Sequence, residues 1–356
     1  MNTIIFERDG ELRKRLQALS EAYFEGKSYK GNYRLYIKTI VGISAWIILY
    51  YNIVFANHAN ILSFFMCISM GFVLPFIGFT TMHDALHGAY SNKKWVNNLM
   101  GYSLELMGPF GILWVKKHSG MHHSRVNIHG QDDDIEAGPF IRSSPNQKWK
   151  KIHKFQQIYA PILYSLLYIY WVWVTDFKKY FSKKILNESI ILRPIDHVVF
   201  WVEKILHIFV MVVVPLQFYS LPEFLIGYFA MALVCGTVLS HIFQPAHVTG
   251  DNEFLVPDEN NRISISQTEL QFISTSNFAT KNKILSWYAG GLNFQIEHHL
   301  FHQVSHVHYP ALQAGVIKIC KDFDIEYVEY KNLWAAFCAH YKHLKKMGET
   351  PKTDST

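Results

Sequence analysis

The chain has 356 residues, of which 50% are hydrophobic, 15% are aromatic and only 17% are charged. Soluble domains average about 25% charged residues, so this composition favours a membrane protein over a soluble enzyme. The net charge of +6 is modest, and we expect no nucleic-acid partner.

The N-terminal 38 residues are expected to form a basic cytoplasmic lead-in. From Thr39 to Met82 there is no Asp, Glu, Lys or Arg, which is enough apolar sequence for two helical crossings of about 20 residues each. We predict these crossings over residues 39–56 and 61–81, joined by a tight turn. Lysines flank the pair but are missing from the turn, so the positive-inside rule places the turn outside and the chain from residue 83 on the cytoplasmic side.

Residues 88–157 are rich in Lys and Arg, and we expect them to stay on the cytoplasmic side. They include the acidic run Asp132-Asp133-Asp134, whose carboxylates could bind a divalent cation. We favour two other interpretations of this run, a solvated loop or hydrogen bonds to a neighbouring metal ligand.

Three apolar segments follow, over residues 158–175, about 197–219 and 224–241. Histidine clusters lie on both sides of these segments, so an even number of crossings must separate the clusters if they are to meet on one side of the membrane. The segment at 158–175 is short, has lysines at both ends and is rich in Tyr and Trp, which favour the headgroup layer. We predict that it lies in the interface or dips into the bilayer and returns, which leaves four transmembrane helices in two hairpins.

The C-terminal part is polar, and we predict two helices over residues 310–323 and 331–347, followed by a disordered tail. The predicted fold class is an all-α integral membrane protein, in which interfacial helices and a cytoplasmic helical cap complete the four spans. The predicted regions are the lead-in at 1–38, a membrane domain at 39–309 and the C-terminal helices and tail at 310–356. Both termini are expected to be cytoplasmic.

Three clusters of histidine carry the chemistry of the chain. They read His83-Asp-Ala-Leu-His87, His118-Ser-Gly-Met-His122-His123 and Gln295-Ile-Glu-His298-His299. A lone His-x-x-x-His pattern is common on surface helices, but three clusters that a membrane fold can bring together are a strong signal. Imidazole binds iron, zinc or copper, so seven His and one Gln at the cytoplasmic ends of membrane helices predict a site for two metal ions.

Mostly nitrogen ligation favours iron, which binds and activates dioxygen, whereas zinc tolerates the same ligands without redox chemistry. An oxygen-activating centre in a membrane protein predicts a substrate that already lies in the bilayer, such as a fatty-acyl chain, a sterol, an alkane or a carotenoid. The metal would carry the attack on an unactivated C–H bond, and the protein would aim it.

With their flanking residues, the clusters resemble the three histidine boxes of the membrane-bound fatty acid desaturases, and within them the front-end or linoleoyl-type acyl desaturases. The matching stretches are HDALHG at 83–88, HSGMHH at 118–123 and GGLNFQIEHHLF at 290–301. The resemblance implies a di-iron centre that uses O2 as co-substrate and two external electrons to remove two hydrogens from a fatty-acyl chain. The metal ligands that it implies are His83, His87, His118, His122, His123, His298 and His299, with Gln295 in the ligand shell or just behind it.

Two features depart from the resemblance. The His-Pro-Gly-Gly haem motif of a fused cytochrome b5 domain is absent, and residues 1–35 are too short for that domain, so we expect a separate electron donor such as ferredoxin or cytochrome b5. His302 stands where the resemblance predicts proline, and we expect it to lie at the surface or behind the ligands. The double-bond position is left open, as is the linkage of the acyl group to coenzyme A, a carrier protein or a lipid.

Two irons bound mainly by imidazole need more ligands than seven His supply, so we expect an eighth near the end of the last span. The candidates are His241 and His247, and we favour His247 because Pro245 predicts a bend or helix end just before it. Related desaturases also place an extra metal-binding His at the end of this span. Asp84 and Glu297, inside the clusters, are predicted to hydrogen-bond ligating imidazoles.

A related di-iron lipid hydroxylase or a sphingolipid desaturase is an alternative, since both would use the same centre. A histidine-rich metal transporter is a remote alternative, because it would need ionisable residues along an ion path inside the spans. The predicted spans contain almost none.

Overall fold

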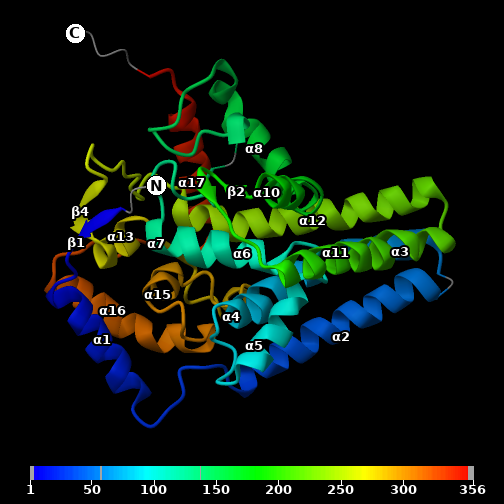
Figure 1. Ribbon diagram of the computed structural model, residues 1–356, viewed down its shortest axis with the longest axis horizontal. Helices are drawn as coiled ribbons and strands as arrows, with labels where there is room; N and C mark the ends of the chain where they lie inside the picture. The colour runs from blue at the N-terminus through cyan, green and yellow to red at the C-terminus, as the bar shows by residue number, and fades with distance from the viewer. Residues whose placement is uncertain (1–3, 57, 137, 352–356) are drawn as a thin grey trace.

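The computed structural model describes residues 4–56, 58–136 and 138–351, so the last five residues of the predicted tail lie outside it. The chain is mostly helical, as predicted. Long helices run side by side toward one end of the molecule, and shorter helices and loops pack together at the other end (Figure 1). The helices α1 (Glu11–Phe24) and α17 (Leu333–Gly348), near the two ends of the chain, both lie with the short elements.

Four helical runs are long and apolar enough to cross a bilayer, which confirms the predicted number. They are α2 (Tyr33–Phe55), the run from α3 to α4 (Asn60–Leu86), the run that begins with α11 (Pro194–Gln217) and α12 (Leu221–His247). At a rise of about 1.5 Å per residue, runs of 23 to 27 residues exceed the hydrocarbon thickness of about 30 Å. α3 packs against both α2 and α12, so the spans form one bundle.

Two of the spans are interrupted by π-helical turns. Their pieces are α3 (Asn60–Ile77), η1 (Gly78–Met82) and α4 (His83–Leu86) in one span, and α11 (Pro194–Ile208), η7 (Phe209–Val213) and η8 (Pro215–Gln217) in the other. A π turn inserts an extra residue into a helix and frequently occurs at a functional site. The turn η1 directly precedes the first histidine cluster.

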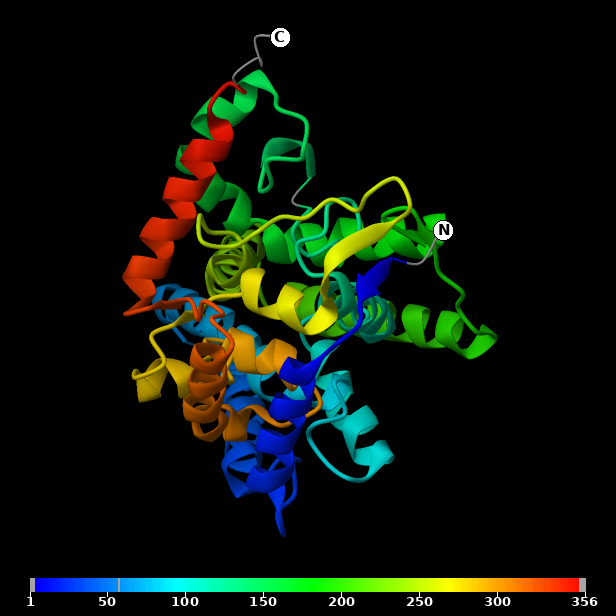
Figure 2. The same ribbon diagram turned by 90° about the vertical axis from the view of Figure 1, so that its left-hand side faces the viewer.

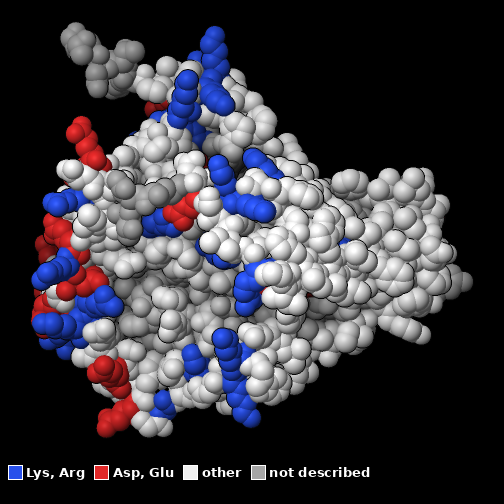
Figure 3. Space-filling model, viewed as in Figure 1, with Lys and Arg blue, Asp and Glu red and all other residues white. Residues whose placement is uncertain are grey.

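The spanning helices form a part of the surface that is nearly free of charged side chains (Figure 3). A band of Lys and Arg borders this part on the side where the short helices begin. Hydrocarbon excludes charged side chains, whereas anionic headgroups attract Lys and Arg. The band therefore marks one boundary of the bilayer, and the positive-inside rule supports the prediction that this boundary is the cytoplasmic one.

The predicted interfacial segment at 158–175 belongs to a bent pair of helical arms, Lys151–Ser165 and Leu167–Ser182, which meet at 62°. The pieces of the arms are η5 (Lys151–Phe155), α8 (Gln156–Ser165), α9 (Leu167–Tyr170), η6 (Trp171–Thr175) and α10 (Asp176–Ser182). α8 and α9 pack against α12, and α17 lies along α8 (Figures 1 and 2). The bend fits a segment that dips into the bilayer and returns, and it also fits a broken fifth span.

The remaining helices form a cap around the histidine clusters. The predicted C-terminal helices are confirmed to within two residues as α16 (Tyr309–Asp322) and α17. α16 packs against α1 and against α15 (Gln295–Leu300). The other helices are α5 (Lys94–Gly101), η2 (Tyr102–Leu104), α6 (Gly111–Lys117), η3 (His118–His122), α7 (His123–Arg125), η4 (Gly138–Phe140), α13 (Gln267–Ile273), α14 (Lys283–Tyr288) and η9 (His306–His308).

The structure also contains three short two-stranded sheets that the sequence pattern did not predict. Two of them link distant segments of the chain, and the third is a local hairpin. The parallel pairs are β1 (Ile5–Glu7) with β4 (Arg262–Ser266) and β5 (Asn277–Phe278) with β6 (Glu329–Tyr330), and the antiparallel pair is β2 (Lys184–Ile185) with β3 (Glu188–Ser189). Strands of two to five residues are too short to show an alternating pattern in the sequence.

We predict that the bent segment as a whole begins and ends on the cytoplasmic side, so that its two outer ends face the same compartment. Lys154 and Lys178 are exposed on the two arms. The variants Lys154→Cys and Lys178→Cys, each made in a Cys338→Ser background because Cys338 is exposed, should both react with a membrane-impermeant maleimide from the cytoplasmic side only. The Cys338→Ser parent is the control and should stay unlabelled. Labelling from opposite sides would make the bent segment a span.

Candidate metal centre

The first histidine cluster lies at the end of the span formed by α3, η1 and α4. His83 begins α4 and His87 caps its end, so the two side chains are four residues apart and share one helix face. Their ring centroids lie 4.6 Å apart. Trp114 of α6 covers the cluster, with its ring 5.7 Å from that of His83 and 5.6 Å from that of His87.

The second cluster lies on another π turn, η3, which follows α6 directly. The ring of His118 stacks on Trp114 at 4.4 Å and on His122 at 5.1 Å. The ring of His123 stands almost perpendicular to that of His118, at 88°. The extra residue of a π turn changes the angle between successive side chains, and here three imidazoles within six residues come to face the same centre.

Two glycines allow the third cluster to lie directly against the first. Gly290 and Gly291 adopt φ angles of 57° and 70°, in the left-handed region that favours glycine. A Cβ atom on Gly290 would lie 2.2 Å from the carbonyl oxygen of Phe79 in η1, so only glycine fits this approach. Because the backbones meet there, α15 packs beside α4, and the ring of His298 lies 4.5 Å from that of His83.

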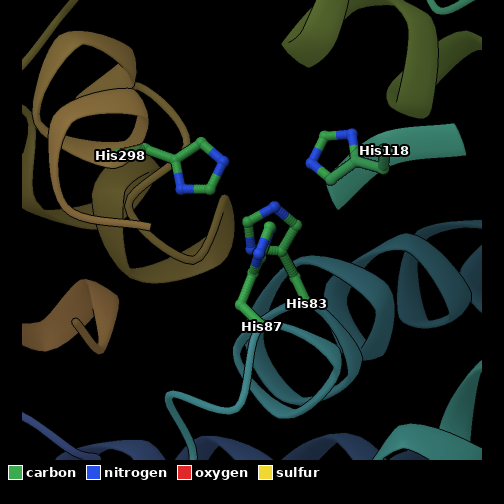
Figure 4. Close-up of side chains that lie close together, drawn as sticks. All are labelled: His83, His87, His118 and His298. Carbon is green, nitrogen blue, oxygen red and sulfur yellow. The ribbon is translucent and has the colours of Figure 1, made fainter. Parts of the chain in front are cut away.

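The clusters converge on two groups of potential metal ligands. The first group has four imidazole nitrogens within 4.8 Å of one another, which come from His83, His87, His118 and His298 (Figure 4). The second group has three nitrogens with the same spacing, which come from His122, His247 and His299. His123 forms a third group with His298 and His299, and therefore lies between the first two.

The residues at this site fit two metal ions. Several inward nitrogens are buried and have no hydrogen-bond partner among the described residues, namely Nε2 of His87, His122, His298 and His299. A buried polar atom without a partner costs about 1–3 kcal/mol, and nitrogens that converge on one point can all be satisfied by one cation. The eight imidazoles of the groups are at most 9% exposed, so bulk water cannot satisfy them.

The acidic run supports the second cluster from behind. His118 donates a hydrogen bond from Nδ1 to Asp134 at 2.9 Å, and His122 donates from Nδ1 to Asp132, also at 2.9 Å. The aspartate between them pairs with Lys179 instead. A carboxylate on Nδ1 fixes the tautomer of an imidazole, so that the Nε2 lone pair faces the centre. Of our interpretations of the run, hydrogen bonding to the candidate ligands is confirmed.

Three further imidazoles are oriented by uncharged partners that the sequence did not reveal. Nδ1 of His299 lies 2.8 Å from Gln271 Oε1, and Nδ1 of His298 lies 3.2 Å from the Tyr309 hydroxyl. Nδ1 of His247 lies 3.3 Å from the Ser274 carbonyl oxygen. Two of these partners are side chains and the third is a backbone carbonyl, and none belongs to one of the histidine clusters. Trp114 was also missed, although its position one helical turn before His118 is a usable signal.

Burial keeps most of these imidazoles neutral. Outside the membrane-spanning runs, four imidazoles have a pKa well below its usual value, first through burial and then through neighbouring imidazoles. They are His87, His123, His298 and His299. Burial also lowers the pKa of His118 to about 4, although Asp134 opposes this shift. For His122, burial is outweighed by the Asp132 carboxylate, which raises the pKa. Neutral imidazole is the metal-binding form, and His122 is the one of these six whose pKa is raised and not lowered.

His247 is brought to the centre and His241 is not. α12 continues through Pro245 and ends after His247, so the proline lies inside the helix rather than at its end. The ring of His247 lies 4.6 Å from that of His122 and 5.0 Å from that of His299. Both nitrogens of His241 have partners of their own, a tyrosine hydroxyl at 2.7 Å and a backbone carbonyl at 2.8 Å.

Gln295 also reaches the second group. Its Nε2 atom lies 2.8 Å from Nε2 of His247, and its Oε1 atom is buried without a partner among the described residues. An amide oxygen is an acceptable metal ligand, and amide nitrogen and oxygen exchange places by rotation of the side chain. Gln295 therefore lies beside the second group, and its place in the ligand shell stays a prediction.

Asp84 and Glu297 do not contact the candidate ligands, so the role predicted for them was wrong. Asp84 accepts hydrogen bonds from the Ser305 hydroxyl at 2.6 Å and from His306 Nδ1 at 3.0 Å. Glu297 accepts from Asn277 at 2.7 Å and from a tyrosine hydroxyl at 2.7 Å. A residue next to a ligand on a helix points about 100° away from it, which explains the error. Both carboxylates instead fasten loops to the helices that carry the ligands.

His302 lies at the edge of the centre. It is partly exposed, and its ring lies 5.0 Å from that of His123 and 5.8 Å from that of His87. It belongs to none of the metal groups found among the described residues. The expectation that it lies at the surface or behind the ligands is confirmed.

The chain is similar to known proteins over most of its length. The model of the family "Fatty acid desaturase" matches residues 59–331. The sn-1 linoleoyl-lipid 6-desaturase of Arthrospira platensis is 32% identical, over 96% of this chain and 93% of that protein. The enzyme of the same name from Synechocystis sp. is 32% identical, over 97% of this chain and 98% of that protein. The acyl-lipid (8-3)-desaturase of Physcomitrium patens is 35% identical, over 93% of this chain and 70% of that protein.

The chain has four apolar helices long enough to span a membrane and a buried set of histidines able to hold metal. The family match covers most of the chain, including all three clusters. The chain belongs to the membrane fatty acid desaturase family and is an oxidoreductase.

Proposed function

We propose that the protein introduces a double bond into a fatty-acyl chain linked to a membrane lipid, at a di-iron centre, with O2 and two electrons from a separate carrier. The observation that carries the proposal is the convergence of unpartnered, buried imidazole nitrogens on two points at the end of the spans. Removal of two hydrogens with O2, two electrons and two protons gives one double bond and two waters. Iron bound at these points supplies the oxygen activation that no side chain can provide.

The proposed ligand set follows the two groups of nitrogens. One iron would be held by the first group and the other by the second group, where Gln295 lies beside His247. His123 is a further ligand between them. The complete proposed set is His83, His87, His118, His122, His123, His247, Gln295, His298 and His299.

The surrounding residues orient the ligands and keep water out. Asp132 and Asp134 hold two imidazoles in the tautomer whose Nε2 faces inward. Trp114 and the buried side chains of Met82 and Met107 form an apolar wall beside the first group. A hydrocarbon substrate meets only apolar surface on that wall, so no polar group competes for position there.

A lipid-linked substrate is supported by the relatives. Two of them are named as acting on a linoleoyl group in the sn-1 position of a lipid. The apolar spans end beside the candidate centre, so a lipid in the bilayer can reach it without leaving the membrane. Coenzyme A and carrier-protein esters are the alternatives, and an assay with each ester separates them.

Electrons from a separate carrier, such as ferredoxin or cytochrome b5, are supported by the sequence. The four-residue motif His-Pro-Gly-Gly does not occur in it. Reconstituted protein should therefore desaturate only when a carrier and its reductase are added.

The related hydroxylase and sphingolipid desaturase would use the same centre, and product analysis distinguishes a hydroxyl group from a double bond.

The transporter alternative is weakened by the contacts inside the spans. α11 does carry ionisable residues, which the sequence reading of this span overlooked. However, Lys204 is buried and donates to Asp176 at 2.8 Å and to the Gly108 carbonyl oxygen at 2.7 Å. A cation fixed to a helix outside the span holds elements together and does not line an ion path.

The first prediction is the product. A host that expresses the protein should accumulate an acyl chain with one more double bond, and the His122→Ala variant should produce none, because one group would lose a ligand. Lipid profiling by mass spectrometry measures both. Ser124→Ala, next to the second cluster but bonded only to backbone carbonyls, is the matched control and should stay active. An unchanged lipid profile with the parent protein, present at normal level and loaded with iron, would contradict the proposal.

The second prediction separates the two histidines of α12. His247→Ala should abolish desaturation and lower the iron content, whereas His241→Ala should retain its iron, because His241 bonds only to residues outside the groups. Iron measured per chain after anaerobic reconstitution gives the answer. The reverse pattern would move the assignment to His241, and normal iron and activity in both variants would remove the eighth imidazole from the centre.

The third prediction concerns the acidic run, in which Asp133 is the control for Asp132 and Asp134. Asp132→Asn and Asp134→Asn should each weaken iron binding about 10–100-fold, the usual effect of losing a partner of a ligating imidazole. Asp133→Asn has the same change of charge but touches Lys179 instead of a candidate ligand, so its iron affinity should stay close to that of the parent. Equal losses in all three variants, measured by competition with a chelator, would show that only net charge matters.

A further inference from the structure

A second cavity lies in the membrane part, away from the metal centre. It has a volume of about 260 Å³ and is bounded by α2, α3, α12 and the end of the α11 run. Its lining is mainly apolar and includes Tyr50, Cys67, Met70, Met231 and Tyr228. The part of the surface around these helices carries almost no charged side chains in Figure 3.

This cavity is too far from the metal centre to hold the tail of the substrate. Met70, at its inner end, precedes His83 by 13 residues on one span, which is about 20 Å along the helix axis. Asn60, at its outer end, precedes His83 by 23 residues, or about 35 Å. Carbon–carbon bonds in an extended chain advance about 1.25 Å each, so an entire 18-carbon chain spans about 21 Å. Such a chain, with any of its middle carbons at the irons, does not enter the cavity.

Packed side chains also separate the two sites. Leu74, Met82, Met107 and Trp114 lie between them in one apolar cluster, and each is at most 7% exposed. None of the described residues that form the metal groups lines the cavity. The cavity is therefore a separate feature of the membrane part.

The chemistry of the lining selects hydrocarbon as the occupant. A water molecule needs two to four polar partners, and the lining offers few polar atoms. An empty cavity loses the dispersion contacts that its walls would otherwise make. With about 30 Å³ for a methylene-sized unit, the cavity takes roughly nine carbons of an alkyl chain. Lipid tails surround this part of the protein and are the nearest source of such a chain.

The mouth of the cavity adds a preference for one kind of headgroup. Glu223 is the only charged residue from Ile205 to Gly250, and the first hairpin has no charged residue from Thr39 to Met82. The Glu223 carboxylate lines the cavity and accepts hydrogen bonds from the Asn60 side chain at 2.7 Å and from the Ser220 hydroxyl at 2.7 Å. A lone exposed carboxylate attracts an ammonium group and repels a headgroup with net negative charge.

We propose that this cavity binds one hydrocarbon chain of a bilayer lipid from the leaflet opposite the metal centre, with an amine-bearing headgroup beside Glu223. The lipid is a bound structural partner of α2, α3 and α12 and is distinct from the substrate. The proposal does not depend on the desaturase activity, because the cavity and the metal centre share no residue.

Photolabelling of the full-length protein in lipid nanodiscs tests the proposal. The probes are phosphatidylethanolamine with a diazirine in mid-chain and phosphatidylglycerol with the same chain, and peptide mass spectrometry locates the label. We expect label on Met70 and Met231, with about five-fold more from the amine-bearing probe, the size of one exposed charge pair. Glu223→Gln should bring the ratio of the two probes close to one.

Matched variants show whether the label marks the cavity. Cys67→Phe fills the cavity and should remove the label from Met231, whereas Cys67→Ser should keep it. Leu62→Phe, on the outward face of the same helix, should also keep it, because Leu62 is 44% exposed. Cys67→Phe should elute from gel filtration as the parent does, which confirms that the variant is folded.

Two results would overturn the proposal. Label confined to outward-facing side chains such as Phe65 and Phe72, and unchanged by Cys67→Phe, would mean that no lipid chain enters. Stronger labelling of Met231 by a substrate with a diazirine at its methyl end would make the cavity part of the substrate site. Both readouts are independent of iron and of turnover, so a failure of the proposed activity would leave this test intact.

Discussion

Eight imidazoles are buried together where two apolar spans end. The Nε2 atoms of four of them, His87, His122, His298 and His299, have no hydrogen-bond partner among the described residues. Each buried nitrogen without a partner costs about 1–3 kcal/mol, so such a centre is unfavourable unless something satisfies the nitrogens together. One hydrogen bond joins two rings, between Nε2 of His118 and Nε2 of His123 at 3.3 Å, and it leaves these four inward nitrogens unsatisfied. A cation at each of the two points removes the cost, and the arrangement of the cap follows from the need to hold those points.

The ligands are held by contacts that do not involve the metal. Carboxylates, an amide, a phenol and a carbonyl oxygen each take the outward nitrogen of one imidazole, which leaves the other nitrogen directed inward. Gly290 lets the backbone of the third cluster touch η1, so the first and third clusters cannot separate without breaking that packing. The site is thus largely organised by the fold, and a metal ion entering it has few side chains to rearrange.

The sequence predicted the centre well because its ligands form local patterns. Three stretches of five or six residues contain seven of the eight imidazoles, and their spacing reflects a helix face. His247 could be chosen over His241 from its position at the end of the span, although Pro245 proved to lie inside the helix. Gln271, Ser274 and Tyr309 could not be predicted, because their role depends on contacts between distant segments.

The errors at Asp84 and Glu297 have the same origin. Both stand beside ligands in the sequence, and a neighbour along a helix points to a different side from the ligand. Their carboxylates hold loops, so they affect the centre through the position of the helices. The four long spans were predicted from apolar runs alone. The bend of the segment at 158–175 depends on how it packs against α12, and this packing cannot be recognised from the apolar run.

The ligands come from four different elements, and this would give bound metal a structural role. The first cluster ends one span, His247 ends another, and the second and third clusters belong to the cap. Metal bound by both groups would therefore tie two spans to two parts of the cap, beside an apolar cluster that already joins them and includes Phe79, Ile242, Phe278 and Leu292. Binding free energy of this kind contributes directly to the stability of the assembled state. The spans also pack directly against one another, α3 against α2 and α12. Loss of metal should then loosen the cap around the histidines first while the helical bundle persists, because the packing of α3 on α2 and α12 does not need the metal.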